Sequence, residues 1–212
     1  MVAPSMRRER RDRQQRKQQI IDVSRKLFLS HGFEKTSIKM IIDEVGGSRR
    51  DVYDLFGGKE DLFEAVMQDL IENVKEAGAL ESLANPSSDI FKDLYNLAYG
   101  LLNKLLEASS ITIMRQFVTI AETHRELGIR AYNSGPASIN RALEVYFEAR
   151  TKDGTLELED IPSAARMFFD MVRGDFQLRM LLTGIDRFED EELSRHVSRA
   201  VRLFLKGAES RA

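Results

Sequence analysis

The stretch Gly32–Phe63, GFEKTSIKMIIDEVGGSRRDVYDLFGGKEDLF, decides the fold of this 212-residue chain. Two short segments with helical apolar spacing flank the Gly46-Gly47 turn, and Arg49-Arg50 follows directly after it. An aromatic side chain comes next, and then Lys59 at the start of the following segment. This order predicts a helix-turn-helix, in which the second helix enters the DNA major groove and the flanking residues contact phosphates.

The composition is typical of a folded, mostly helical protein. Hydrophobic residues make up 42% of the chain and charged residues 31%, an ordinary globular balance. With only 4 prolines and no long β-branched runs, many short strands are not expected. The chain has no cysteine, which excludes disulfides, thiolate metal sites and cysteine catalysis. No apolar run approaches the roughly 20 residues of a membrane span, and no apolar segment follows the basic N-terminus, so we expect a cytoplasmic protein.

The net charge of −2 conceals a strong asymmetry along the chain. Residues 1–60 contain 14 Lys and Arg against 9 Asp and Glu, a net of +5, and the remainder contains 18 against 25, a net of −7. A basic front on an acidic body is the electrostatic pattern of a nucleic-acid binder, because phosphate neutralisation supplies most of the sequence-independent affinity. A solvated, disordered arm is the alternative. The position of the basic run just ahead of the expected helix-turn-helix favours DNA.

Helical periodicity and stop signals divide the chain into about nine helices. Thr36 or Ser37 is expected to cap the second helix and Ser48 the third. The expected helices lie at about 10–31, 37–45, 48–56, 59–79, 89–107, 110–122, 127–152 with a kink at Gly135-Pro136, 161–183 and 190–208. The predicted fold is therefore all-α: a basic flexible arm (1–14), a three-helix helix-turn-helix domain (15–63) and a larger helical domain (64–212), joined through the long fourth helix.

The residues after the glycine turn fit the requirements of a recognition helix. Ser48 and Asp51 have capping-box spacing, with Ser48 as N-cap and Asp51 reaching back to it, which accounts for an acidic residue beside phosphates. Arg49 and Arg50 then occupy the first helical turn, from which arginine bridges guanine O6 and N7 in the major groove. Two solvated surface arginines are the alternative.

Further side chains are candidates for phosphate contacts. Tyr53 either donates its hydroxyl to a phosphate or packs on the inner face of the helix. Lys59 opposes the dipole at the N-terminus of its own helix, an unfavourable position that a phosphate bound by the free amides would make favourable. Thr36 and Lys39, at the start of the second helix, are expected to hold another phosphate in the same way. The predicted DNA-binding residues are Thr36, Lys39, Ser48, Arg49, Arg50, Tyr53 and Lys59.

This stretch resembles the DNA-binding signature of the TetR family of transcriptional regulators. That signature reads approximately Gly-Phe/Tyr, Thr-Ser/Thr-Ile/Val, Ile-Ala and Ala-Gly-Val-Ser, followed by a Tyr and a Phe before Lys-Glu. The resemblance implies a three-helix DNA-binding domain that reads an operator. The matching residues are Gly32, Phe33, Thr36, Ser37, Ile38, Ile41, Gly46, Ser48, Tyr53, Phe56, Lys59 and Glu60.

Several positions depart from that signature. Ile42 and Val45 replace the usual small residues, and Gly47 replaces the usual valine. Arg50-Asp51 stands where Gly-Thr is common, and Leu55 replaces a frequent aromatic or histidine phosphate contact. The resemblance therefore indicates that the chain reads DNA and leaves open which sequence it reads.

The second half of the chain resembles the AefR-like C-terminal domain found in one subgroup of TetR regulators. The resemblance rests on Arg115-Gln116-Phe117, Glu126-Leu127-Gly128, Asp153-Gly154-Thr155-Leu156 and the closing run Ala200–Gly207. It implies that residues 64–212 bind a ligand and form a homodimer through the last two helices, with an inducer cavity among the fourth to eighth helices. Two-fold symmetry then implies a pseudo-palindromic operator, with the recognition helices about one DNA turn apart.

Apolar patterns in the last two helices agree with a dimer. The final helix carries an apolar stripe, and the helix before it is crowded with aromatic side chains. This apolar surface is wider than one helix bundle needs, which favours a four-helix seam between two protomers over plain core packing. The expected seam residues are Phe168, Met171, Leu193, His196, Val197, Ala200, Val201 and Phe204.

Methionine and aromatic side chains also suit an adaptable pocket for an apolar or aromatic effector, and ordinary core packing is the alternative for each. Arg173 is expected to pair with a ligand anion, with Asp170 or with Asp175. The expected pocket residues are Met67, Tyr95, Met114, Phe117, Phe147, Phe169 and Arg173.

An enzyme is the main rival class. The chain has 3 histidines, His31, His124 and His196, on three different expected helices. Glu122 and Glu126 flank His124, but no second histidine lies at metal-ligand spacing. A phosphate-cradling glycine loop and a nucleophile elbow are also missing from the sequence. We therefore expect no catalysis, no metal and no cofactor.

A TetR-like adaptor that acts through protein contacts without binding DNA is the other rival. The presence of Arg49, Arg50, Tyr53 and Lys59 argues against it. The prediction is a homodimeric repressor that binds a double-stranded DNA operator and is released by a small apolar or aromatic effector.

Overall fold

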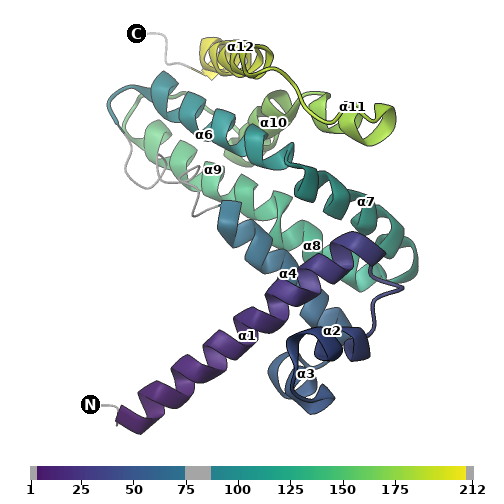
Figure 1. Cartoon of the computed structure of the whole chain (residues 1–212). Helices are drawn as coiled ribbons and strands as arrows, with labels where there is room; N and C mark the ends of the chain where they lie inside the picture. Colours follow the sequence, from purple (N-terminus) through teal and green to yellow (C-terminus); the bar gives the residue numbers. More distant parts are fainter. Residues whose placement is uncertain (1–3, 75–86, 209–212) are drawn as a thin grey trace. The chain divides into compact units, whose positions relative to one another are not determined.

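The computed structural model describes residues 4–74 and 87–208, and the regular elements in these ranges are helices (Figure 1). The all-α prediction is confirmed. The end of the predicted fourth helix, up to Ala79, lies outside the described residues. The helices are α1 (Pro4–His31), α2 (Ile38–Val45), α3 (Arg49–Phe56), α4 (Lys59–Val74), α6 (Ile90–Leu105), α7 (Ala108–Thr123), α8 (Arg125–Ser134), α9 (Pro136–Lys152), α10 (Ile161–Arg173), α11 (Phe176–Thr183) and α12 (Asp190–Ala208).

The chain forms two compact units, one of residues 1–70 and 116–131 and one of residues 71–115 and 132–212. The chain passes from one unit to the other within α4, within α7 and within α8. Residues 116–131, which we assigned to the larger domain, group instead with the helix-turn-helix. Residues 4–14, which we expected to form a flexible arm, continue α1 as a helix. None of the helices in the described ranges is long and apolar enough to cross a membrane.

An aromatic cluster forms the core of the first unit. The Phe28 ring lies 5.9 Å from the Phe33 ring and 5.1 Å from the Phe63 ring, and Phe33 and Phe63 lie 5.0 Å apart. These rings come from α1, from the loop after it and from α4, and all three are buried. Their packing therefore joins the helix before the helix-turn-helix to the helix after it. Ile41 of α2 and Val52 of α3 are also fully buried and fix the inner faces of the two short helices.

Residues 116–131 belong to this unit because they pack on its aromatic core and on α4. The Phe117 ring meets the Phe63 ring edge-on at 5.7 Å. Arg130 forms an ion pair with Glu64 at 2.9 Å. These contacts join residues far apart in the sequence, so helical periodicity carries no sign of them.

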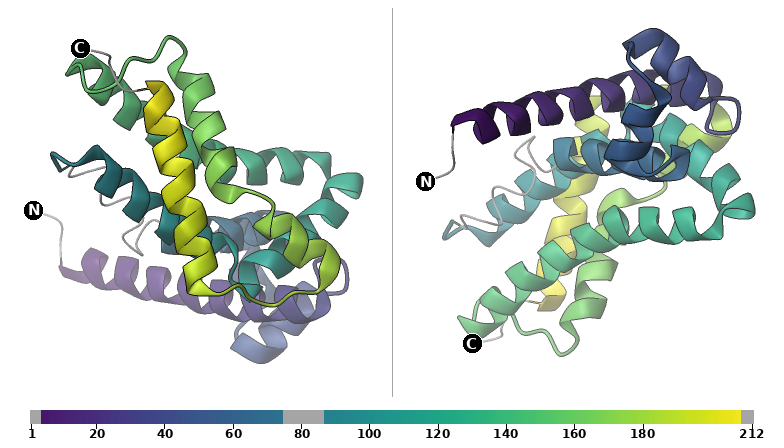
Figure 2. Two further views of the ribbon diagram at one scale, coloured as in Figure 1. Left: turned by 90° about the horizontal axis from the view of Figure 1, so that it is seen from above. Right: turned by 90° about the horizontal axis from the view of Figure 1, so that it is seen from below.

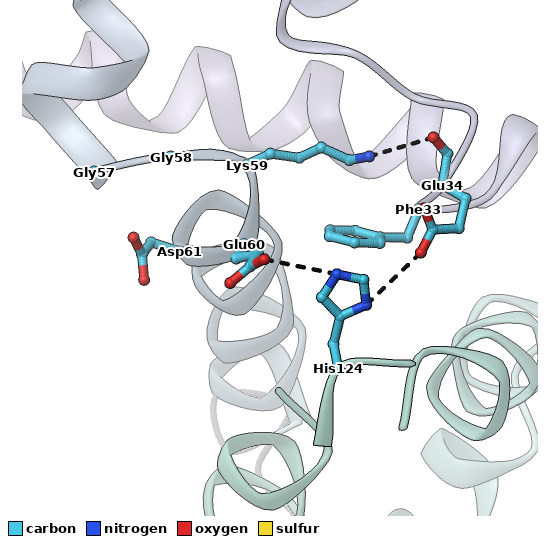
Figure 3. A pocket seen from close by; sticks show the side chains of 8 residues that line it. All are labelled: Phe33, Glu34, Gly57, Gly58, Lys59, Glu60, Asp61 and His124. Carbon is cyan, nitrogen blue, oxygen red and sulfur yellow. Dashed lines mark hydrogen bonds and ion pairs between the residues drawn. The ribbon is translucent and has the colours of Figure 1, made fainter. Parts of the chain in front are cut away.

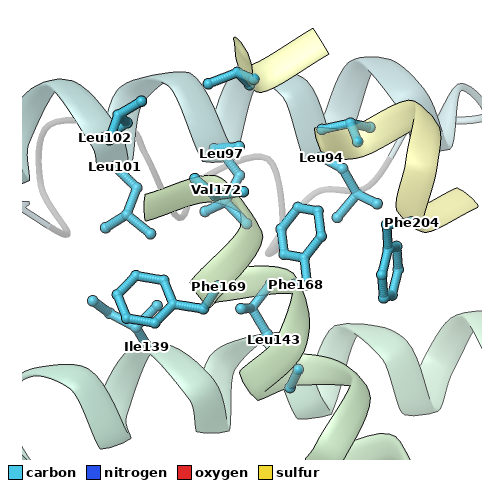
Figure 4. Close-up of a cluster of buried hydrophobic side chains, with 14 of the residues drawn as sticks. Leu94, Leu97, Leu101, Leu102, Ile139, Leu143, Phe168, Phe169, Val172 and Phe204 are labelled. Atoms are coloured by element: carbon cyan, nitrogen blue, oxygen red, sulfur yellow. The ribbon is translucent and has the colours of Figure 1, made fainter. Parts of the chain in front are cut away.

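The second unit is built on one hydrophobic core between α6, α9, α10 and α12 (Figure 4). Figure 2 shows α12 beside α10, and α12 also packs on α6. Each helix contributes a stripe of large apolar side chains, as the helical spacing predicts. The core includes Leu94, Leu97, Leu101 and Leu102 of α6, Ile139, Leu143 and Phe147 of α9, Phe168, Phe169 and Val172 of α10, and Val197, Val201 and Phe204 of α12.

The apolar stripe of α12 is buried against other helices of the same chain. The Phe204 ring stacks on Phe147 at 5.0 Å and meets Phe168 edge-on at 5.0 Å. His196 is engaged as well, because its Nε2 donates to the carbonyl oxygen of Met171 at 2.9 Å. Within the described residues, Phe168, Leu193, Val197, Ala200, Val201 and Phe204 are buried, and Met171 and His196 are half-buried.

Six of the eight predicted seam side chains thus lie in the protomer's own core, and the dimer seam itself stays a prediction. The α12 stripe is wide because it covers two neighbours of its own protomer, α6 and α10. Large apolar side chains of the same helices do point outward, but at other positions. Met167 of α10 and Leu203 of α12 are each 65% exposed.

Two predicted helices are interrupted in the structure. Pro136 opens α9, where its missing amide hydrogen is tolerated, so the predicted helix 127–152 is split into α8 and α9. Gly174 ends α10 with φ of +53°, and a Cβ at this position would lie 3.0 Å from the His196 ring. The predicted helix 161–183 is therefore α10 followed by α11.

Candidate DNA-binding surface

Ser48 caps α3 through the predicted capping box, which the structure confirms. The Ser48 hydroxyl accepts a hydrogen bond from the Asp51 amide at 3.3 Å and donates one to Asp51 Oδ1 at 2.8 Å. In return, Asp51 Oδ2 accepts from the Ser48 amide at 3.1 Å. The bonds from the Ser48 amide and hydroxyl, assisted by Arg16, lower the pKa of the Asp51 carboxyl below its usual 3.8. Asp51 is thus a structural carboxylate of the helix start.

An acid titration tests this role of Asp51. A carboxyl whose pKa is lowered in the folded state stabilises the fold above its unfolded pKa, and that stability is lost as the pH falls through the folded pKa. We expect Ser48→Ala to raise the Asp51 pKa back toward 3.8 in a ¹³C NMR titration, since it removes the hydroxyl partner. Asp51→Asn should remove the corresponding acid-dependent loss of stability below pH 3.8. An unchanged Asp51 titration in Ser48→Ala would contradict the capping assignment.

The outer face of α3 carries the predicted base-reading side chains. Arg49, Arg50 and Tyr53 are exposed, whereas Val52 on the opposite face is buried. Arg50 Nε lies 3.4 Å from Asp54 Oδ2, with 86% of the Arg50 side chain exposed. Such an exposed pair one turn apart stabilises by only about 0.3–0.5 kcal/mol, so it is easily exchanged for a DNA contact. Tyr53 is 55% exposed, so it does not pack on the inner face.

Thr36 and Lys39 occupy different environments at the start of α2. The Thr36 side chain is 1% exposed, and its hydroxyl donates to the carbonyl oxygens of Gly32 at 2.8 Å and Leu27 at 3.2 Å. It therefore ties the loop to α1, and the prediction of a phosphate contact from this side chain is wrong. Ser37 is the N-cap of α2. Lys39 is exposed and lies 2.6 Å from Asp43, so it is available at the surface.

Lys59 points across the first unit toward the loop after α1 (Figure 3). Its Nζ donates to the Glu34 carbonyl oxygen at 3.3 Å and lies 4.2 Å from the centre of the Phe33 ring. Burial lowers the pKa of the Lys59 ammonium, against the opposing effect of Glu34 and Glu60. The position of Lys59 at the helix N-terminus is therefore explained without a phosphate. The Glu34 carbonyl oxygen and the face of the Phe33 ring take the place of the expected anion.

His124 joins the same cluster from the corner between α7 and α8 (Figure 3). Its Nδ1 lies 3.7 Å from a Glu34 oxygen and its Nε2 lies 3.6 Å from a Glu60 oxygen. The ring also meets Phe33 edge-on at 5.5 Å. The two nitrogens face different carboxylates, and no group of three or more such side chains in the described ranges is placed to hold a metal ion. Glu34 and Glu60 come from other segments of the chain, so the residues next to His124 in the sequence carry no sign of these partners.

The predicted pocket residues divide between the two units. Met67 and Phe117 lie in the first, and the other five lie in the second. Phe147 and Phe169 share the core of the second unit, whereas Tyr95 donates to or accepts from the Ser194 hydroxyl at 2.8 Å. Surface hollows are lined by Arg11, Gln14, Gln15 and Gln18, and by Phe33, Glu34, Gly57, Gly58, Lys59, Glu60, Asp61 and His124. None of the predicted pocket residues lines either of these two hollows.

Arg173 pairs within its own helix. Its Nη2 lies 2.8 Å from Asp170 Oδ1, and the guanidinium lies 5.9 Å from the centre of the Phe169 ring. Of the alternatives left open by the sequence, the structure shows the pair with Asp170. Met114 is half-buried in α7.

A short capped helix that turns two arginines and a tyrosine outward, behind a glycine turn and a second short helix, has the form of a recognition helix. The protein is thus of the helix-turn-helix DNA-binding class. Comparison with known families agrees. Residues 20–66 match the bacterial regulatory proteins of the tetR family, and residues 92–207 match the AefR-like transcriptional repressor C-terminal domain. The chain belongs to the TetR family of transcriptional regulators.

Individual relatives are regulators as well. Over 77 residues the chain is 30% identical to the HTH-type transcriptional repressor AcnR of Corynebacterium efficiens, covering 34% of this chain and 41% of AcnR. Over 76 residues it is 33% identical to the HTH-type transcriptional regulator YezE of Bacillus subtilis, covering 33% of this chain and 39% of YezE. These relatives and families are regulators rather than enzymes, in agreement with the prediction from the sequence.

Solved structures share the fold over nearly the whole chain. A putative TetR-family regulator from Mesorhizobium loti superposes with a TM-score of 0.83 at 24% identity, covering 93% of this chain and 98% of that one. The flavonoid-responsive regulator FrrA superposes with a TM-score of 0.79 at 25% identity, covering 93% of this chain and 99% of FrrA.

Proposed function

We propose that the protein is a homodimeric repressor that binds a pseudo-palindromic operator through α3 and is released from it by a small apolar or aromatic effector. The observation that carries the DNA-binding half is the outer face of α3, where Arg49, Arg50 and Tyr53 are exposed on a helix held by its own capping box. Members of this family bind DNA as dimers, and the repressor AcnR is one of the relatives.

Within the first unit, we assign contacts to base edges and contacts to phosphates to different side chains. Arg49 and Arg50 are placed for base edges, because they occupy the first turn of the helix that enters the groove. Tyr53 and Lys39 are exposed and serve as phosphate contacts that fix the docking register. Ser48 donates its amide and hydroxyl hydrogens to Asp51, so it reaches a phosphate only by giving up a bond of the capping box. Lys59 contributes mainly by holding the loop after α1 to the start of α4, and it reaches a phosphate only by leaving the Glu34 carbonyl oxygen.

The dimer face is assigned to the outward side of α10 to α12. Met167 and Leu203 directly precede Phe168 and Phe204 in the chain, whose rings lie 5.0 Å apart in the core. The two exposed side chains are each 65% exposed. Leu178 and Leu182, one turn apart on α11, are also more than half exposed. Large apolar side chains that stay exposed in a protomer are typical of an interaction surface. A two-fold dimer through the last helices buries them and sets the spacing of the two recognition helices.

We infer the class of effector from the aromatic side chains in and beside the core of the second unit. The Phe91, Tyr95 and Tyr99 rings stack in a row at 6.1 and 5.8 Å, and Phe147 and Phe169 lie in the adjoining core. The structural relative FrrA is named as responsive to flavonoids, which are aromatic compounds. We infer that an apolar or aromatic effector inserts among these rings of the second unit, with Met114 as a further candidate. Its binding is expected to change the spacing of the two recognition helices.

Binding to DNA at several salt concentrations tests the DNA-binding half of this proposal. If the basic first unit neutralises several phosphates, the affinity for duplex DNA falls steeply and linearly in a plot of log affinity against log salt. Lipophilic and aromatic compounds are then added to the complex, and one that releases the DNA identifies the effector class. Absence of any DNA binding at low salt would support the adaptor alternative instead.

A further inference from the structure

Arg16 of α1 binds the turn that carries the recognition helix. Its Nη1 donates to the carbonyl oxygen of Val45 at 3.3 Å, and its Nη2 donates to the carbonyl oxygen of Gly46. The same Nη2 lies 3.3 Å from Oδ2 of Asp51, with 27% of the Arg16 side chain and 38% of the Asp51 side chain exposed. One guanidinium thus satisfies the end of α2 and the capping carboxylate of α3 together, which its planar set of donors allows.

Gly47 leaves the space that this guanidinium fills. A Cβ at Gly47 would collide with Arg16 Nη2 and with Asp51 Oδ2, and would lie 3.2 Å from Arg16 Cζ. The backbone there has φ of +91°, a conformation that residues other than glycine rarely adopt. The valine that TetR-type signatures usually carry at this position is therefore incompatible with Arg16 where it stands. This accounts for a departure that the sequence left unexplained.

The same face of α1 reaches the other end of α3. Arg13 Nη2 donates to the Asp54 carbonyl oxygen at 3.4 Å, and Lys17 Nζ lies 5.7 Å from the centre of the Phe56 ring. Arg16 and Lys17 lie three and four residues after Arg13, so both share a side of α1 with it. These three residues belong to the N-terminal basic run, for which the sequence favoured DNA over a solvated arm. In the structure they contact α3 or the turn before it instead.

We propose that Arg16 is a positioning residue for operator recognition, which sets the orientation of α3 on the turn, and that Gly47 is the matched position that gives its guanidinium room. The proposal rests on α3 being the helix that reads DNA. It assigns to Arg16 an effect on base discrimination rather than on general affinity, because Arg16 acts through the placement of Arg49 and Arg50.

A double-mutant cycle on operator discrimination tests this coupling. The full chain and its variants Arg16→Ala, Gly47→Ala and the double variant are titrated with an operator selected by the wild type and with a scrambled duplex. We expect each single change to lower the ratio of the two affinities about tenfold, and the double variant to lie near the lower single variant, because both changes remove the same contacts. Independent effects would multiply to about a hundredfold and would overturn the pairing of Arg16 with Gly47.

Arg25→Ala is the matched control, since Arg25 lies on the same helix and forms ion pairs with Asp22 at 3.0 Å and with Asp69. It is expected to lower the melting temperature without changing discrimination. Arg16→Lys keeps the charge but not the fork of donors, so it should lose part of the discrimination and provides the comparison should Arg16→Ala fail to fold.

Three results would overturn the proposal. Equal behaviour of the Arg16 and Arg25 variants makes Arg16 merely structural. An equal loss of affinity for operator and scrambled DNA, with a salt slope reduced by about one, makes it a phosphate contact instead. Full discrimination in Arg16→Lys would remove the need for the fork of donors. If the wild type selects no operator, the proposed function itself is rejected. That outcome is distinct from the three results above, which reject only the role of Arg16.

Discussion

Replacing Arg49 and Arg50 together with alanine is expected to abolish discrimination between the operator and a scrambled duplex. Each bidentate arginine–guanine contact supplies about 1–3 kcal/mol of discrimination, so losing two lowers the affinity ratio by roughly thirtyfold or more. Both side chains are exposed, and the capping residues Ser48 and Asp51 remain, so α3 itself should be retained. Fluorescence anisotropy titrations with the two duplexes measure the ratio, and circular dichroism checks the helix content.

A charge-matched control separates base reading from general attraction to DNA. The double variant Arg141→Ala and Lys152→Ala also removes two positive charges, here from exposed positions on α9 in the second unit. This control should keep its discrimination and lose little affinity. If the Arg49 and Arg50 variant discriminates as well as the wild type, then α3 does not read the bases and the recognition-helix assignment is wrong.

Leu203→Asp is expected to convert the protein into a monomer and thereby to weaken operator binding by orders of magnitude. Leu203 is exposed on the outward side of α12, so an aspartate there leaves the protomer folded. In a two-fold dimer each protomer brings the same residue to the seam, so one substitution buries two unpaired carboxylates. A monomer reads only one half-site, which removes the gain from simultaneous contact with two. Analytical ultracentrifugation with and without the operator measures both effects.

The matched control for this change is Val145→Asp, which places the same charge at an exposed valine of α9. It should remain dimeric and bind the operator as the wild type does. If Leu203→Asp stays dimeric while Leu182→Asp dissociates, the seam lies on α11 rather than on α10 and α12. A wild type that sediments as a monomer at micromolar concentration would contradict the dimer altogether.

Local chemistry made the recognition helix predictable from the sequence. The capping box of Ser48 and Asp51 depends on residues three apart, and the glycine turn depends on backbone freedom at two adjacent positions, so both leave a local signature. The helix starting at Lys59 and the buried stripe on α12 follow equally from local spacing. These are the features that the structure reproduces.

The sequence does not show which surface the apolar stripe of each helix packs against. Helical spacing shows that Val197 and Val201 are buried, but it does not distinguish the protomer's own α6 and α10 from a partner. The position of Lys59 at a helix N-terminus predicts a phosphate contact, whereas its partners in the structure, Glu34 and Phe33, come from another segment of the chain. Tertiary contacts of this kind, including those of Arg16 and His124, leave no periodic signal.

Selection of bound duplexes from a random-sequence pool tests whether the protein is a dimer that reads DNA through α3. We predict that one sequence family is enriched and that it contains two inverted half-sites whose centres lie about 10 base pairs, or a multiple of one DNA turn, apart. The Arg49→Ala and Arg50→Ala double variant should enrich no sequence in the same experiment. Recovery of the unselected pool by the wild type, or of a single half-site without its inverted repeat, would contradict a dimer that reads DNA through α3.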